Sequence, residues 1–124
     1  IMAFWNAPLD VENHAEMAVK SALEMIEELK VVNESLPVEI KIGIGINTGE
    51  CVVGNMGSDQ RFDYSVLGDA VNLASRLESN SKNYDATLIV GEDTMEETEH
   101  LFDYEYVDII TVKGQSREVK IYTL

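Results

Sequence analysis

The sequence has few positive charges and a single cysteine. Nine Lys and Arg residues stand against 23 Asp and Glu residues, which gives a formal net charge of −14 at pH 7. A surface this acidic repels a phosphate backbone, so we expect no nucleic-acid partner. Cys51 has no second cysteine with which to form an internal disulfide, and this favours a reducing, cytoplasmic compartment.

Long apolar runs and targeting signals are also missing. No run approaches the roughly 20 apolar residues that a transmembrane helix needs, and no charged-then-apolar signal segment begins the chain. The 124 residues, 26% charged and 45% apolar, are typical of one globular domain. A chain of this length is too short for a second domain.

Two segments have the spacing of amphipathic helices. Apolar residues recur every three or four positions over residues 15–29, with Asp10 as the expected cap and an end before Pro37. The same spacing recurs over residues 70–77, where Asp69 is the expected N-cap. Both segments are therefore predicted to bury one face.

Strand patterns occupy much of the remaining chain. Residues 38–46 alternate strictly between apolar and other residues, and residues 51–55 form a second apolar run. The polar turn between them predicts a hairpin over residues 38–55. The other expected elements are a loop at 56–63, strands at 1–5, 87–90, 104–112 and 118–124, a short acidic helix at 92–99, and a turn at 113–116.

This order of elements predicts an α/β (α+β) fold. Helices would pack on one face of a largely antiparallel sheet. The strand expected at residues 1–5 begins in mid-pattern, with no polar residue or cap before it. We therefore expect N-terminal elements of the fold to lie outside this chain.

The glycines of residues 43–49 do not form a phosphate-binding loop. The segment lacks the Lys-Ser/Thr pair of such a loop and does not open a helix. We instead expect Gly43 and Gly45 to let another element approach the strand closely.

No set of side chains has the spacing of a metal site. His14, His100 and Cys51 are far apart in the sequence, and Asp63 and Asp69 are not paired at ligand geometry. We assign no metal ligand to this chain.

Asn72 and Arg76 lie four residues apart and so share one face of the second helix. That face points away from the apolar stripe. An amide and a guanidinium are thereby directed at the same outside point, although a solvated polar face has the same pattern.

The stretch from Arg61 to Glu78 resembles, almost residue for residue, the signature of the class III adenylyl and guanylyl cyclase catalytic domain. Residues 1–8 resemble the strand after that family's metal hairpin, residues 42–57 its Gly-Ile-x-x-Gly segment, and residues 112–114 its Val-Lys-Gly element. The resemblance covers most of the chain in the family's order, and it is nearest to the bacterial cyclases.

The resemblance implies a ferredoxin-like palm that acts as a head-to-tail homodimer with nucleoside triphosphate at the interface. Asn72 would orient the ribose, Arg76 would stabilise the transition state at the α-phosphate, and Lys113 would hold the terminal phosphates. It also implies two Mg²⁺ or Mn²⁺ ions. Their Asp ligands and the base-recognising Lys would lie upstream of Ile1, so this chain alone is expected to be inactive.

Ser65 occupies the position that selects the base in this family. Many adenylyl cyclases have Asp there and guanylyl cyclases Cys, and Ser resembles a subgroup that is mostly adenylyl cyclase, so ATP is the expected substrate. The resemblance also implies a sensor or membrane module upstream. Three alternatives stay open: a guanylate cyclase, a non-enzymatic dimerisation or regulatory module, and a palm enzyme that makes cyclic dinucleotides, which the missing Gly-Gly-Asp/Glu-Glu-Phe hairpin disfavours.

Overall fold

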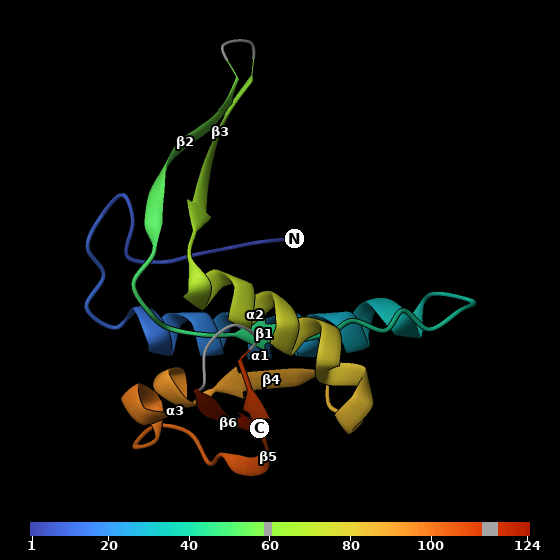
Figure 1. Ribbon diagram of the computed structural model, residues 1–124. Helices are drawn as coiled ribbons and strands as arrows, with labels where there is room; N and C mark the ends of the chain where they lie inside the picture. The colour runs from blue at the N-terminus through green and yellow to red at the C-terminus, as the bar shows by residue number, and fades with distance from the viewer. Residues whose placement is uncertain (59–60, 113–116) are drawn as a thin grey trace.

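The computed structural model describes residues 1–58, 61–112 and 117–124, arranged as Figure 1 shows. Its helices are α1 (His14–Glu34), α2 (Asp69–Asn80) and α3 (Glu92–Thr98), and a 3₁₀ turn, η1 (Ser81–Tyr84), follows α2. Its strands are β1 (Ile44–Ile46), β2 (Val52–Ser58), β3 (Arg61–Leu67), β4 (Leu88–Gly91), β5 (Glu105–Thr111) and β6 (Glu118–Thr123).

The strands form a mixed sheet and a separate hairpin. In the sheet the order is β1-β4-β6-β5, with β1 parallel to β4 and the other pairs antiparallel. β2 and β3 pair antiparallel and extend away from the sheet as a long hairpin, which we call the arm (Figure 1). The expected α/β class, with helices on a sheet of mostly antiparallel pairs, is confirmed.

The helices cover both faces of the sheet. Leu88 and Val90 of β4 pack with α1, whereas Ile89 between them packs with α2. The expectation that the helices share one face was wrong, because a strand that is apolar at every position is buried on both sides. The α1 cluster contains Ala18, Val19, Ala22, Ile46, Leu88 and Val90, and the α2 cluster contains Leu73, Leu77, Ile89, Ile110, Val119 and Ile121.

The two glycines around β1 let α2 lie directly against the strand, as the sequence predicted. A methyl group on Gly45 would overlap the backbone oxygen of Ala74 and the backbone nitrogen of Glu78. A methyl group on Gly43 would overlap Oγ of Ser81 and lie 3.0 Å from the carbonyl oxygen of Glu78. Helix and strand therefore meet backbone to backbone.

The predicted hairpin over residues 38–55 was wrong. β1 pairs in parallel with β4, with Ile44 opposite Leu88, and residues 52–58 pair instead with residues 61–67. The expected loop at 56–63 is thus largely strand, and residues 59–60 lie outside the described part. The arm was missed because it projects from the body, so its sequence lacks the alternation that a buried face imposes.

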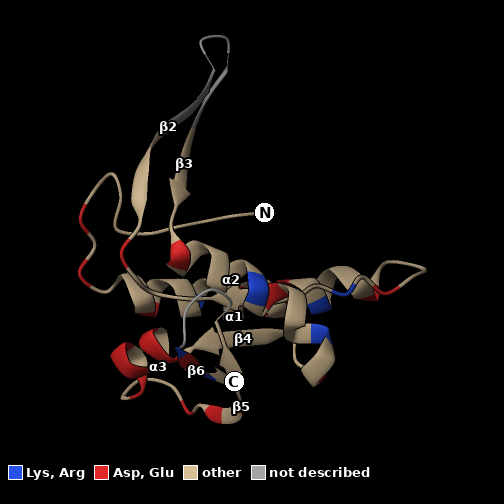
Figure 2. Cartoon of the chain, in the orientation of Figure 1, with Lys and Arg blue, Asp and Glu red and all other residues tan. Residues whose placement is uncertain are grey.

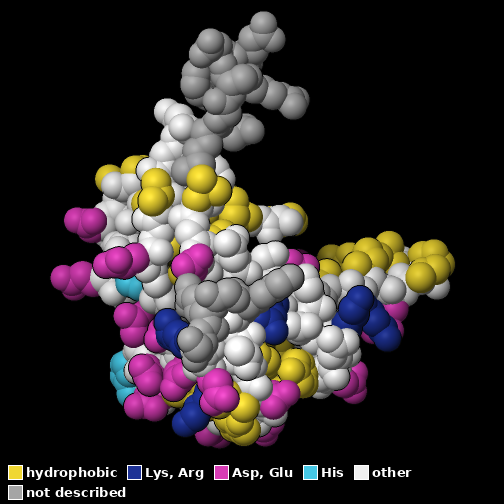
Figure 3. Space-filling model, viewed as in Figure 1, with side chains coloured by type: hydrophobic (Ala, Val, Ile, Leu, Met, Phe, Trp, Pro, Cys, Tyr) yellow, Lys and Arg dark blue, Asp and Glu magenta, His cyan; other side chains and the backbone are white. Residues whose placement is uncertain are grey.

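Two predicted strands are shorter or missing. Val38, Ile40 and Ile42 are exposed, at 73%, 47% and 36%, and only residues 44–46 of that segment form a strand. Figure 3 shows hydrophobic side chains over the segment that follows α1. Residues 1–5 form no strand, because none of the described strands pairs with them.

The helix starts differ slightly from the prediction. Asn13, not Asp10, occupies the N-cap position of α1, and Gly68 occupies that of α2, so Asp69 is the first helical residue. α1 ends at Glu34, before Pro37 as expected. The expected turn at 113–116 lies outside the described residues. Among the helices that are described, none combines the length and apolarity needed to cross a membrane.

We predict that Gly45→Ala destabilises the fold by about 1–3 kcal/mol, the usual cost of overpacking, because the new methyl group meets helix backbone that cannot rotate away. Urea unfolding measures the change. Gly54→Ala in β2 is the matched control, since a methyl group there meets nothing within 4 Å. Equal stability of the two variants would contradict the close contact between α2 and β1.

Candidate functional site

The predicted site residues lie on the arm and on α2. Ser65 is half-buried on β3, opposite Gly54 of β2 and three residues before the N-cap of α2. Asn72 is exposed on α2, and Arg76 follows one turn later on the same helix. Lys113 lies outside the described residues.

Arg76 connects α2 to the end of β5. Its Nη1 atom donates a hydrogen bond to the carbonyl oxygen of Thr111 at 2.6 Å. The next residue, Val112, donates its amide to the carbonyl oxygen of Arg117 at 3.0 Å. This second bond closes the stem of the segment that contains Lys113, so the guanidinium of Arg76 lies at the base of that segment.

Among the described residues, no carboxylate forms an ion pair with Arg76. The ion pairs within the described ranges join Lys20 to Glu16, Lys30 to Glu27 and Arg117 to Asp93, and none includes Arg76. In Figure 2, red acidic segments are prominent on α3 and before α1, and α2 carries both red and blue segments. A carbonyl partner orients the guanidinium and leaves its positive charge available.

Sequence reasoning missed a Tyr–Asp pair beside Arg76. The Tyr84 hydroxyl donates to Oδ2 of Asp108 at 2.9 Å, and the amide of Ile109 donates to Oδ1 at 2.8 Å. A register shift between Tyr106 and Asp108 interrupts the regular β5–β6 pairing beside this carboxylate. No sequence signal joins two residues 24 positions apart.

The contact with Asp108 also changes the acidity of the Tyr84 hydroxyl. The hydrogen bond to Asp108 raises the pKa of Tyr84 above 10.0, with further increases from desolvation and from the negative charge of Asp108. The positive charge of Arg76 lowers the pKa of Tyr84 and so partly offsets these increases.

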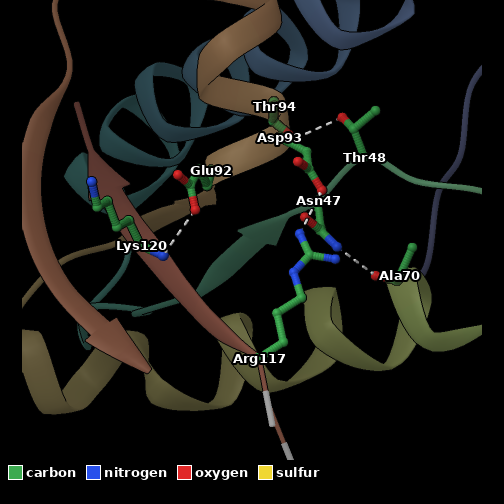
Figure 4. A network of polar contacts seen from close by, with 8 residues as sticks. All are labelled: Asn47, Thr48, Ala70, Glu92, Asp93, Thr94, Arg117 and Lys120. Atoms are coloured by element: carbon green, nitrogen blue, oxygen red, sulfur yellow. Dashed lines mark hydrogen bonds and ion pairs between the residues drawn. The ribbon is translucent and has the colours of Figure 1, made fainter. Parts of the chain in front are cut away.

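A polar network surrounds the end of β1, as Figure 4 shows. Asn47 Nδ2 donates to the carbonyl oxygen of Ala70 at 3.1 Å, and the hydroxyls of Thr48 and Thr94 are 2.7 Å apart. On α3, Glu92 accepts a hydrogen bond from the backbone of Lys120 at 3.3 Å. These bonds join β1 to α2 and α3, and α3 to β6.

A small hollow of about 190 Å³ lies beside this network. Asn47, Glu50, Asp69, Asp93 and Arg117 contribute to its walls, while its apolar lining includes Leu73. Its size is below that of a typical nucleotide pocket. Neither Asn72 nor Arg76 lines this hollow; Asn72 is exposed on α2 and Arg76 is half-buried.

A metal site needs several His, Cys, Asp or Glu side chains close together. The described residues bring together no group of three or more His, Cys, Asp or Glu side chains that could hold an ion. The side chains of the described residues therefore do not fit the two-ion site that the resemblance implies.

Known proteins with similar sequences point to one family. The family described as adenylate and guanylate cyclase catalytic domain matches residues 2–124. Adenylate cyclase 1 of Rhizobium meliloti (strain 1021) is 34% identical over 127 residues, covering 98% of this chain and 19% of that protein.

Solved structures agree as well. The adenylyl cyclase CyaB from P. aeruginosa superposes with a TM-score of 0.82 at 35% identity, covering 94% of this chain and 62% of that one. The guanylate cyclase domain of RhGC from Catenaria anguillulae, in complex with GTP, gives 0.81 at 34% identity, with coverages of 94% and 62%. The chain thus spans less than two thirds of the proteins that it matches.

We predict that the Tyr84 hydroxyl stabilises the fold below about pH 10 and that this contribution is lost as the pH rises through the raised pKa of Tyr84. Tyr84→Phe should cost about 1 kcal/mol or less at neutral pH and lose less stability than the unsubstituted protein between about pH 9 and pH 11. Urea unfolding across this range measures both effects. Tyr106→Phe, on the same strand as Asp108, is the control. Identical pH profiles for the Tyr84 variant and the unsubstituted protein would contradict the Tyr84–Asp108 pair.

Proposed function

Because this chain belongs to the family of adenylate and guanylate cyclase catalytic domains, we propose that it forms part of an adenylate cyclase site that converts ATP to cyclic AMP and pyrophosphate. The observation that carries the proposal is the placement of Arg76. Its guanidinium forms no ion pair with a described carboxylate and is bonded to Thr111, next to the Val112–Arg117 hydrogen bond that joins the chain on either side of residues 113–116. It lies one helical turn from the exposed amide of Asn72.

The reaction is an internal displacement at phosphorus. The ribose 3′-hydroxyl gives up its proton to water as its oxygen attacks the α-phosphorus. A new O3′–P bond forms, and the bond from the α-phosphorus to the bridging oxygen breaks, releasing pyrophosphate. Negative charge shifts onto the phosphoryl and leaving oxygens as this happens. Preorganised cationic donors stabilise that charge most effectively, since they need no reorientation during the step.

Each residue has a chemically suited role in this proposal. The amide of Asn72 donates to and accepts from ribose oxygens, which orients the 3′-hydroxyl for attack. Arg76 presents planar N–H donors to the α-phosphoryl oxygens. Lys113 acts on the terminal phosphates as a point charge.

Divalent ions would neutralise phosphate charge and activate the 3′-hydroxyl in this chemistry. The described side chains do not fit such ions, so no step here is assigned to them. We propose that the ion ligands, like the upstream sensor or membrane module, lie outside this chain.

ATP is the proposed substrate because of Ser65 and the relatives. A serine hydroxyl both donates and accepts, so it accommodates the amino group of adenine. The rhizobial protein and CyaB are named as adenylate cyclases, whereas RhGC is a guanylate cyclase in complex with GTP. The choice between ATP and GTP therefore needs a direct test.

A head-to-tail homodimer is proposed as the active form. The face with Asn72 is open, so a second copy is needed to enclose a nucleotide there. The arm projects from the body (Figure 1) and exposes apolar surface at Val52 and Leu67, which are 68% and 58% accessible. Apolar surface of this kind is typical of protein interfaces.

We predict that Arg76→Ala in the full-length protein lowers kcat for ATP by about 10²-fold or more while KM changes little, because the guanidinium meets charge that appears only in the transition state. Its effect on the unfolding free energy should be about 1 kcal/mol, since one hydrogen bond to Thr111 is lost. Asn72→Ala should also lower kcat.

Lys82→Ala is the matched control, because Lys82 is an exposed cation in η1, directly after α2. Full activity of the Arg76 and Asn72 variants would overturn the proposed site and favour a dimerisation or regulatory module.

We predict that the full-length protein uses ATP in preference to GTP. Ser65→Asp should sharpen this preference, because a carboxylate only accepts hydrogen bonds and so favours the 6-amino group of adenine over the carbonyl oxygen that guanine has at that position. The ratio of kcat/KM for the two nucleotides measures it. Ser79→Asp, on the exposed side of α2, controls for the added charge. A preference of the unsubstituted protein for GTP would instead make it a guanylate cyclase.

A further inference from the structure

Asn47 lies where the arm leaves the body of the protein. The chain passes from β1 through residues 47–51 into β2, and β3 returns through Gly68 into α2. The hydrogen bond from Asn47 Nδ2 to the carbonyl oxygen of Ala70 therefore joins the outgoing and returning segments at the base of the arm (Figure 4).

The base of the arm is tightly packed. A methyl group on Gly49 would lie 2.7 Å from the Cβ atom of Ala70. Gly68 has a φ of 147°, and a methyl group on it would lie 3.3 Å from the carbonyl oxygen of Glu50. The two segments therefore cross at close range, where a small shift of either one moves the arm relative to α2.

The amide of Asn47 is held in one orientation. Its Oδ1 atom is buried, has no hydrogen-bond partner among the described residues, and lies 2.5 Å from the position of a methyl group on Gly91. Exchanging the oxygen and nitrogen would place Oδ1 against the carbonyl oxygen of Ala70, where two acceptors repel each other. The next residue, Thr48, is fixed by its 2.7 Å hydrogen bond to the buried hydroxyl of Thr94.

We propose that Asn47 is a positioning residue that fixes the arm relative to α2, and thereby Ser65 relative to Asn72 and Arg76. This inference rests on the proposed function. Because the base would be held from the arm and the phosphate from α2, rotation at the base of the arm misaligns the 3′-hydroxyl and the α-phosphorus. Misalignment of this kind lowers kcat more than it weakens binding.

The test is Asn47→Asp in the full-length protein, an isosteric change that replaces the donor by an acceptor. We expect kcat for ATP to fall about 10-fold or more, with a smaller change in KM, since small misplacements have large effects on rate. Asn47→His restores an N–H donor and should regain most of the lost kcat. Asn33→Asp is the matched control, because Asn33 Nδ2 donates to a backbone carbonyl, that of Ile40, at 3.0 Å outside this region.

A second measurement distinguishes a positioning role of Asn47 from a general loss of structure. If Asn47 acts through Arg76, Asn47→Asp should lower kcat much less in an Arg76→Ala background than in the unsubstituted protein. Hydrogen exchange at the amides of Val71 and Asn72, which donate to Gly68, should quicken in the Asn47 variant. If Asn47→Asp unfolds the protein, Asn47→Ala replaces it.

The outcomes are distinct. If Arg76→Ala lowers kcat but the Asn47 variants do not, or if their effects multiply without coupling, the positioning role is overturned and the proposed function stands. If Arg76→Ala leaves kcat unchanged, the proposed function fails, and the positioning role fails with it.

Discussion

Backbone contact between α2 and β1 determines where Asn72 and Arg76 lie. Since Gly43 and Gly45 have no Cβ atoms, the helix lies directly on the strand, and Leu73 and Leu77 reach the apolar cluster around Ile89. Helical geometry then directs Asn72 and Arg76 away from that cluster. A larger residue at either glycine would lift the helix and lengthen the 2.6 Å bond from Arg76 to Thr111. The positions of Asn72 and Arg76 thus depend on the lack of side chains at Gly43 and Gly45.

The hydrogen bond from Arg76 to Thr111 is important because the chain is strongly acidic. With a net charge of −14, most positions would bring a cation next to a carboxylate, as happens to Lys20 and Arg117. Arg76 is instead held by a neutral carbonyl, and the nearby carboxylate of Asp108 already accepts hydrogen bonds from Tyr84 and Ile109. The arrangement keeps one guanidinium oriented and charged in an acidic protein. An anionic phosphate can then compete for it.

The sequence predicted those parts of the structure that local rules govern. Apolar spacing predicted α1 and α2, and the glycine pair predicted the close approach to β1, because both depend on neighbouring residues. Burial of the sheet on both faces, the Tyr84–Asp108 pair and the bond from Asn47 to Ala70 depend on residues far apart in the chain. Residues 47–49 were interpreted as part of a turn, because Asn, Thr and Gly are typical of turns. The same residues can equally join two elements, as Asn47 does through its bond to Ala70.

The position of the arm also depends on contacts between residues that are far apart in the chain. A two-stranded hairpin is marginally stable alone in water, so its orientation depends on where it is attached and on what covers it. The described contacts of the arm with the body include the return into α2 and the 5.8 Å ring contact between Phe4 and Tyr64. Ser65 lies next to Tyr64, close to the body, where these contacts constrain it most strongly. Further out, β2 and β3 pair with each other, and a second copy of the chain is the proposed partner of the arm.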